Sequence, residues 1–227
     1  MAKSLVDAIS SSRFYAYRID PADSDTTCIL RYVWNMALSE ALYPTLQCLE
    51  IALRNGIHDA ASAHFGTDLW YEDPRLITLP KTRQIIKRAK RTLRATKKPV
   101  EPNRVLSELQ FGFWRHLFYA EYEQKLWRPI IRATFPNAPK ARLARKGIGA
   151  RVHRAYELRN RVFHHEPIWR QPDLLDAHAE ILETISWISV AMAELARTGD
   201  RLEATYEMDL KALEPQLHAI LTRHTAP

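Results

Sequence analysis

The sequence predicts an all-α protein, a helical bundle with additional helices, and three observations lead to this prediction. Apolar residues recur three and four positions apart along most of the 227-residue chain, which is the spacing of a buried helix face. Glycine is scarce at 6 residues, and the 13 prolines fall mostly between the periodic segments. Hydrophobic residues form 46% of the chain, enough for a sizeable core, so we expect residues 1–227 to form a single domain.

The first part of the chain is predicted to contain an N-terminal extension and three helices. The extension covers residues 1 to about 25 and ends in Asp23-Ser24-Asp25, a run that can cap a following helix. The first helix should begin at Thr26 and break or kink at Pro44, which suits the first turn of a second helix reaching about His64. The third is the cationic segment 81–98, ended by Pro99.

Residues 104–127 are dense in aromatic side chains and are predicted to form one long helix, or two helices joined at Gly112. Aromatic side chains on a helix can stack nucleobases. At this density they more often belong to the core. We therefore expect most of the following side chains to be buried: Phe111, Phe113, Trp114, Phe118, Tyr119, Tyr122 and Trp127.

Glycine and proline divide the rest of the chain. Gly147 and Gly149 are expected to let the chain turn before a helix that runs from about Ala150 to His165. Pro167 disfavours helix at the residue before it and so ends that helix. The last two predicted helices cover residues 172–197 and 202–223.

The charge distribution favours an anionic partner. The formal net charge is +7, although a soluble protein that is simply basic would show the same balance. Two stretches, residues 81–98 and 140–154, carry many cations and no Asp or Glu. A run of one sign more often meets a polyanion than a mixed surface does, so RNA is the expected partner. The candidate RNA-binding residues are Lys87, Arg88, Lys90, Arg91, Arg94, Arg145 and Lys146.

The cysteines and the terminal segment indicate a cytoplasmic protein. Cys28 and Cys48 lie in apolar helical patterns without metal-binding spacing, so we expect buried free thiols in a reducing compartment. Residues 1–19 lack the apolar core of a signal peptide. The longest apolar run, residues 185–196, is too short and too polar to span a membrane. We expect no metal ion and no other cofactor.

The stretch from Glu157 to Pro167 carries the candidate chemistry. Asn160 and His164 are four residues apart and so share a helix face, while the long side chain of Arg159 lies nearby. An imidazole exchanges protons near neutral pH, and a guanidinium grips two phosphate oxygens. This set suits attack by an RNA 2′-hydroxyl on its own phosphodiester, with no metal needed.

Two questions about this stretch stay open at the level of the sequence. A polar helix end, whose histidine and arginine cap free carbonyls, explains the same residues equally well. The sequence also does not decide whether His164 would act as a general acid or as a general base.

The stretch from Arg159 to His164 resembles the Arg-x(4–6)-His motif of the HEPN superfamily (higher eukaryotes and prokaryotes nucleotide-binding). Residues 158–168 are similar to its Abi-like (abortive infection) branch, as are residues 34–35, 49–55 and 111–114, in the same order. The resemblance implies a HEPN-like helical fold and a metal-independent endoribonuclease, acting as a toxin or an abortive-infection effector in phage defence. It also implies a homodimer with a composite active site, and an antitoxin RNA or protein as a further partner.

The resemblance also assigns roles to residues. Arg159 and His164 would be catalytic, Asn160 would support them, and His165 could share the role of His164. Three residues match the upstream polar segment of the family and would be auxiliary: Glu50, Arg54 and Asn55. Glu50 and Arg54 are also spaced as an ordinary ion pair on one helix face.

Two other functions fit the same sequence. One is a catalytically silent HEPN module that binds RNA or a nucleotide. The other is a helical interaction protein whose basic faces bind a regulatory RNA or protein. In that case segment 81–98, rather than the Arg/His motif, would be essential.

Overall fold

A computed structural model describes residues 2–208, 210–215, 217 and 219 of the chain. Within them the protein is all-α, as the sequence predicts, and no strand occurs. The chain divides into two compact units. Unit 1 comprises Met1–Tyr43, Leu158–Asp176 and Asp200–Pro227, and unit 2 comprises Pro44–Glu157 and Ala177–Gly199.

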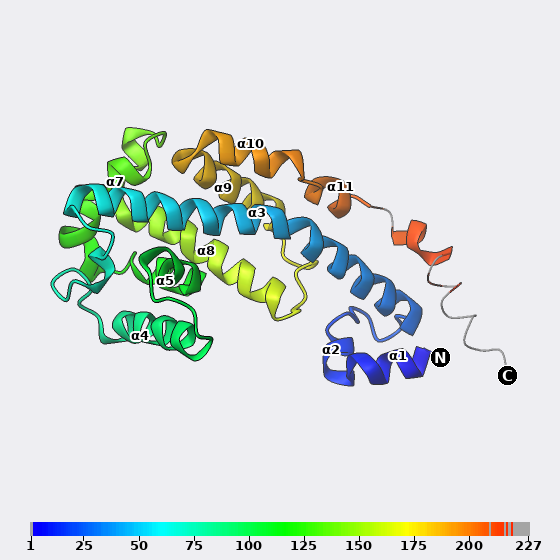
Figure 1. Cartoon of the computed structure of the whole chain (residues 1–227). Coiled ribbons are helices and arrows are strands. Elements are labelled where there is room, and N and C mark those ends of the chain that lie inside the picture. The colour runs from blue at the N-terminus through cyan, green and yellow to red at the C-terminus, as the bar shows by residue number, and fades with distance from the viewer. Residues whose placement is uncertain (1, 209, 216, 218, 220–227) are drawn as a thin grey trace. The chain divides into compact units, whose positions relative to one another are not determined.

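The longest helix, α3, covers Asp25–Phe65 and contributes residues to both units (Figure 1). Pro44 lies inside it, so the predicted helix break at this proline is wrong. A proline within a helix removes one backbone hydrogen bond and crowds the carbonyl four residues earlier. Leu42 and Leu46 are both almost completely buried. Because packing supplies most helix stability in proteins, burial before and after the proline can offset its cost.

Unit 1 is built around the first turns of α3. The helices α1 (Ala2–Ile9) and α2 (Ser11–Tyr15) lie against this end of α3 (Figure 1). Their shared core consists of Phe14, Tyr17, Cys28, Ile29, Leu30 and Leu217. The predicted N-terminal extension therefore contributes to a hydrophobic core.

The C-terminal part of unit 1 is less regular than predicted. The expected helix over residues 202–223 is interrupted, because α11 (Leu202–Tyr206) ends well before the short 3-10 turn η5 (Leu210–Leu213). The indole N–H of Trp34 donates to the carbonyl of Thr205 at 2.8 Å, which ties α11 to α3. The end of that predicted helix, residues 220–223, lies outside the described residues.

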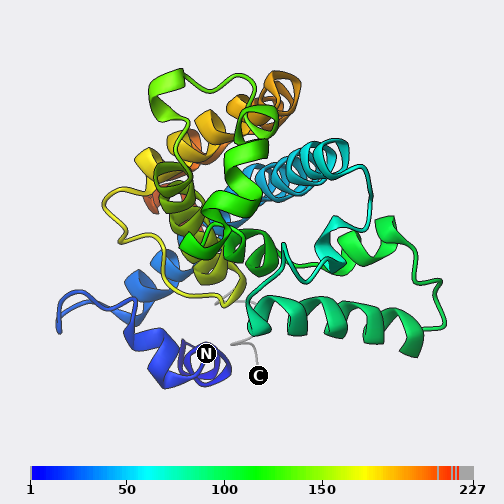
Figure 2. The same ribbon diagram turned by 90° about the vertical axis from the view of Figure 1, so that its left-hand side faces the viewer.

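Unit 2 contains the aromatic core. Helix α4 (Pro80–Ala95) packs against η1 (Trp70–Glu72), α5 (Pro102–Glu108) and α6 (Phe111–His116) (Figures 1 and 2). The predicted burial of the aromatic residues between 111 and 127 is confirmed, except for Tyr119, which is 36% exposed. Unit 2 also contains parts of α3, of α8 (Arg145–Phe163) and of α9 (Leu174–Ile188). Its complete elements are η1 (Trp70–Glu72), α4 (Pro80–Ala95), α5 (Pro102–Glu108), α6 (Phe111–His116), η2 (Ala120–Tyr122), η3 (Glu123–Trp127), α7 (Arg128–Thr134), η4 (Lys140–Arg142) and α10 (Val190–Thr198).

The predicted long helix over residues 104–127 is wrong, because these residues form several short elements. The break falls at Leu109 and Gln110, and Gly112 lies inside α6. The indole of Trp114 donates to the Leu109 carbonyl at 3.2 Å. This bond satisfies a backbone acceptor that an uninterrupted helix would use itself.

Two further helix boundaries differ from the prediction. Helix α8 (Arg145–Phe163) includes Gly149 instead of beginning after it. A Cβ atom at this position would lie 3.0 Å from the Cβ atom of Phe118, so the missing side chain allows close packing. The predicted helix 172–197 is split into α9 (Leu174–Ile188) and α10 by Ser189, whose hydroxyl accepts from the N–H of Met192 at 3.2 Å as an N-cap.

Candidate functional site

The histidine pair lies in the turn that ends α8. The N–H of Glu166 donates to the carbonyl of Arg161 at 2.8 Å, and the N–H of His165 donates to that of Val162 at 3.1 Å. This pairing is a Schellman motif, in which one residue takes a left-handed conformation. His165 is that residue, with φ 57°. Glycine is the common choice at such a position, so the turn holds His165 in a conformation that costs backbone energy.

The segment after the histidines is held by Asn35. This side chain is buried, and its Oδ1 accepts from the N–H groups of Ile168 at 2.7 Å and Trp169 at 3.2 Å. Arg161 adds a second tie by donating to the Pro167 carbonyl at 2.8 Å. Pro167 lies beyond the last residue of α8, so this bond ties down the following segment and does not cap a free carbonyl of the helix end as predicted. It does not account for the two imidazoles.

His164 and His165 both line a pocket of about 470 Å³ within unit 1. Its other side is formed by α2 and the segment after it, which contribute Arg13 and Tyr17. Arg13 is exposed, and its side chain forms no ion pair with any residue that the structure describes. The full lining is Ser12, Arg13, Ala16, Tyr17, Tyr32, His164, His165, Glu166 and Pro167.

Tyr17 adds an unsatisfied donor to this pocket. Its ring is 2% exposed, and its buried hydroxyl has no hydrogen-bond partner among the described residues. Burial raises the pKa of Tyr17 to about 12, and neighbouring Tyr32 acts in the same direction. The hydroxyl therefore keeps its proton at neutral pH.

Arg159 and Asn160 do not line this pocket, although both are partly exposed. The guanidinium carbon of Arg159 lies 4.2 Å from the ring centroid of Phe163, whose ring is 5.9 Å from that of Tyr43. Arg159 and His164 are five residues apart, so on a helix they point in directions about 140° apart. Within one chain the structure thus brings His164 and His165 together with Arg13 and leaves Arg159 on another face of α8.

The auxiliary candidates lie in unit 2, on α3. Arg54 donates through Nε to the Oδ1 atom of Asn55 at 3.1 Å. Glu50 and Arg54 are half-buried, whereas Asn55 is exposed. These residues belong to a different unit from the histidine pair.

The tertiary structure pairs one candidate cation of α4 with a carboxylate and leaves the others unpaired. The buried stripe of this helix is Thr82, Ile86, Ala89 and Leu93. Lys90 pairs with Glu72 at 2.5 Å, so its charge is neutralised despite the acid-free sequence around it. The remaining candidates on this helix are exposed and have no ion pair within the described part of the chain: Lys87, Arg88, Arg91 and Arg94.

The two candidates at the start of α8 differ in the same way. Arg145 pairs with Glu123 and donates to the Phe118 carbonyl, so its guanidinium is occupied within unit 2. Lys146 is exposed. Of these two, Lys146 is the side chain free to meet an external phosphate.

Nothing in the sequence links the pocket residues Ser12, Arg13, Tyr17 and Tyr32 to the Arg/His motif. They lie far from the Arg/His motif along the chain, and only packing places them beside it. An aromatic patch at residues 14–17 is visible in the sequence. Nothing in that patch points to the histidines.

Comparison with known proteins does not assign a family. No protein-family model matches the chain, and neither curated proteins nor solved structures show a significant match. The functional interpretation therefore depends on the pocket and on the motif resemblance.

The described residues contain neither a metal-binding cluster nor a membrane-spanning helix. They contain no group of three or more His, Cys, Asp or Glu side chains placed to hold a metal ion. None of their helices combines the length and the apolar character needed to cross a membrane. Cys28 is buried but Cys48 is only half-buried, so the predicted burial is confirmed for Cys28 and wrong for Cys48; both are free thiols.

Proposed function

We propose that the protein is a metal-independent endoribonuclease and that the pocket beside His164 and His165 is where RNA is cleaved. The observation that carries the proposal is the lining of this pocket, which combines two imidazoles with the unpaired guanidinium of Arg13. The resemblance of residues 159–164 to the HEPN motif supports the same reaction class.

The proposed reaction uses the RNA's own 2′-hydroxyl. One imidazole removes the proton of this hydroxyl, and the oxygen attacks the adjacent phosphorus. The bond from phosphorus to the 5′-oxygen breaks, and a protonated imidazole donates its proton to that oxygen. The products are a 2′,3′-cyclic phosphate, which water can open, and a 5′-hydroxyl. Arg13 would stabilise the charge that develops on the phosphoryl oxygens.

Arg159 enters this proposal through a second copy of the chain. Its Nε atom is buried without a hydrogen-bond partner among the described residues. Next to it lies an exposed aromatic pair, with Tyr43 50% and Phe163 42% exposed. We infer a C2 homodimer that covers this surface and lets Arg159 of one chain serve the pocket of its partner, since C2 dimers are the commonest oligomers.

The biological role in this proposal is that of a cytoplasmic toxin or abortive-infection effector that acts on RNA. An antitoxin RNA or protein would then be a further partner. The role and the antitoxin partner are both proposed from the resemblance of the motif and the other matching segments to the Abi-like branch of the HEPN superfamily.

The decisive experiment is cleavage of total RNA in EDTA, comparing the wild type with His164→Ala and mapping the product termini. The variant should lose about 10²- to 10⁴-fold in rate, as is typical when a general acid or base is removed. His153→Ala is a matched control, because His153 is an exposed histidine on the same helix outside the pocket. DNA should survive, since it lacks the 2′-hydroxyl. Activity that requires magnesium, or products with 5′-phosphates, would contradict the proposal.

Subunit mixing tests the contribution of Arg159. Arg159→Ala and His164→Ala should each be inactive alone. If Arg159 acts across the dimer, random mixing places one intact site in half of the dimers and should restore about a quarter of the wild-type activity. Arg159→Lys should stay impaired, because an ammonium cannot replace the bidentate guanidinium. A monomer that still cleaves RNA, or no recovery on mixing, would contradict this part of the proposal.

A further inference from the structure

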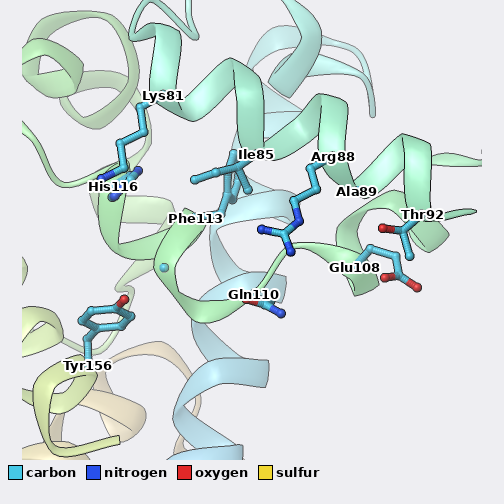
Figure 3. Close-up of a pocket in the computed structure, with 11 residues that line it drawn as sticks. Lys81, Ile85, Arg88, Ala89, Thr92, Glu108, Gln110, Phe113, His116 and Tyr156 are labelled. Atoms are coloured by element: carbon cyan, nitrogen blue, oxygen red, sulfur yellow. The ribbon is translucent and has the colours of Figure 1, made fainter. Parts of the chain in front are cut away.

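We propose that unit 2 holds a second ligand site, which binds a phosphate monoester in the pocket between α4 and α6. The pocket has a volume of about 390 Å³. Figure 3 shows Lys81 and Arg88 extending from α4 toward it, with the hydroxyl of Tyr156 on the opposite side. This site lies in a different unit from the histidine pair and goes beyond the proposed cleavage reaction.

The charges around the pocket suit a dianion. Lys81 and Arg88 are exposed and form no ion pair with any described residue. They are seven residues apart and therefore project from the same side of α4, about two turns from each other. A phosphate monoester carries close to two negative charges near neutral pH, which two unpaired cations can match.

One carboxylate lines the same pocket. Glu108 lies with Thr92 at the end away from Lys81 and His116 (Figure 3). Lys81 and His116 therefore mark one end of the pocket and Glu108 the other, with Arg88 between them. A ligand would place its phosphate at Lys81 and Arg88, and groups that donate hydrogen bonds could reach Glu108.

His116 provides a second, independent observation. It is 6% exposed, and its Nδ1 atom has no hydrogen-bond partner among the described residues. Buried polar atoms are nearly always paired, so an orphan facing a pocket indicates a missing partner. Burial, and then the charges of Lys81 and Arg115, lower the pKa of His116. A phosphate oxygen bound beside Lys81 would supply a partner and oppose this shift.

The remaining lining indicates an organic phosphate rather than a bare ion. Ile85, Ala89 and Phe113 form an apolar part of the wall, and Gln110 offers a carboxamide beside it. The volume falls within the range of about 300–1,000 Å³ that small-molecule sites occupy. A free mononucleotide and the 5′-phosphorylated end of an RNA both carry a phosphate monoester next to a flat ring.

The test is calorimetric titration of the His164→Ala chain, which should not cut RNA. The probes are inorganic phosphate, AMP, and one dinucleotide with and without a 5′-phosphate. Lys81→Gln and Arg88→Gln should each weaken binding about tenfold or more, the effect expected for a hydrogen bond to a charged group. Arg132→Gln is the matched control, because this exposed cation of unit 2 lies on α7, outside the pocket and outside the cationic face of α4. It should change affinity less than about twofold.

A second readout follows His116 directly. Its imidazole pKa, measured by NMR, should rise when AMP or the 5′-phosphorylated dinucleotide binds. Tight binding of AMP would identify a free nucleotide as the ligand that supplies the phosphate. Binding of the phosphorylated dinucleotide alone would identify the 5′ end of an RNA as that ligand. The proposal is overturned if no phosphate probe binds, if the 5′-hydroxyl dinucleotide binds equally well, or if Arg132→Gln weakens binding as much as the pocket variants do.

The two proposals can fail separately. Cleavage is read from the products of the chain with His164 intact, whereas phosphate binding is read in the chain without it. An inactive wild-type protein would leave the titrations unaffected.

Discussion

The carboxamide of Asn35 accepts a hydrogen bond from the backbone N–H of Ile168 at 2.7 Å, which ties α3 to the segment after the histidine pair. The same oxygen accepts from Trp169 at 3.2 Å. Ile168 is completely buried, so its N–H cannot turn to water instead. One buried side chain thus positions one wall of the candidate active pocket.

Asn35→Ala should lower the free energy of unfolding by about 1–3 kcal/mol, because it leaves buried donors unsatisfied. Cleavage should fall as well, since the segment from Glu166 onward would lose its tie to α3. Urea denaturation measures the first effect. Asn103→Ala is a suitable control, because this asparagine is exposed on α5 and should change stability by less than about 0.5 kcal/mol. Equal stabilities of the two variants would contradict the role of Asn35.

His165→Gly should separate backbone strain from chemistry. Glycine adopts the left-handed conformation of this position without steric cost, so we expect the variant to unfold at the same temperature as the wild type or a higher one. Its cleavage rate should fall, but less than that of His164→Ala. Thermal denaturation and RNA cleavage are measured on the same samples. Equal losses of activity in the two variants would mean that His165 performs one of the two proton transfers.

The exposed cations of α4 should contribute to RNA binding, whereas Lys90 should contribute little. Changing Lys87, Arg91 and Arg94 together to Gln should weaken binding to all RNA sequences. It should reduce the slope of log K against log salt by about 2, given roughly 0.7 per phosphate contact on single strands. Lys90→Gln should leave the slope nearly unchanged, because Glu72 already neutralises Lys90. Filter binding across a salt series provides the measurement. An unchanged slope in the triple variant would show that this face of α4 does not bind RNA.

Asp23 should make the stability of unit 1 sensitive to acid. Hydrogen bonds from Arg31 and from the N–H groups of Asp20 and Ile19 hold the pKa of this carboxyl well below its usual range. A carboxyl whose pKa is lower in the folded protein than in the unfolded chain stabilises the fold at pH values above its unfolded pKa of about 3.9. That stability is lost as the pH falls toward the folded value.

Asp23→Asn should therefore destabilise the protein at pH 6, and the gap to the wild type should narrow below about pH 4. Urea denaturation of both proteins at several pH values tests this. A gap that stays constant down to pH 2 would show that the carboxylate charge is not what stabilises this region.

The helical class, the amphipathic character of α4 and the burial of most aromatic residues between 111 and 127 could all be predicted from the sequence. Periodicity, helix propensity and local charge act over a few residues, so they can be read along the chain. The location of the histidine pair at a helix end also follows from local signals, because Pro167 disfavours helix before it. The chemistry proposed for these histidines rests on their residue types.

Only the tertiary structure decided which distant residues meet. It pairs Lys90 with Glu72, places Arg13 beside the histidines, and leaves Arg159 on another face of α8. It also keeps α3 continuous through Pro44 and breaks the helix at Leu109 instead of Gly112. In each case the energy of packing, or of a hydrogen bond between separate segments, outweighs local propensity, and neither can be read from neighbours in sequence.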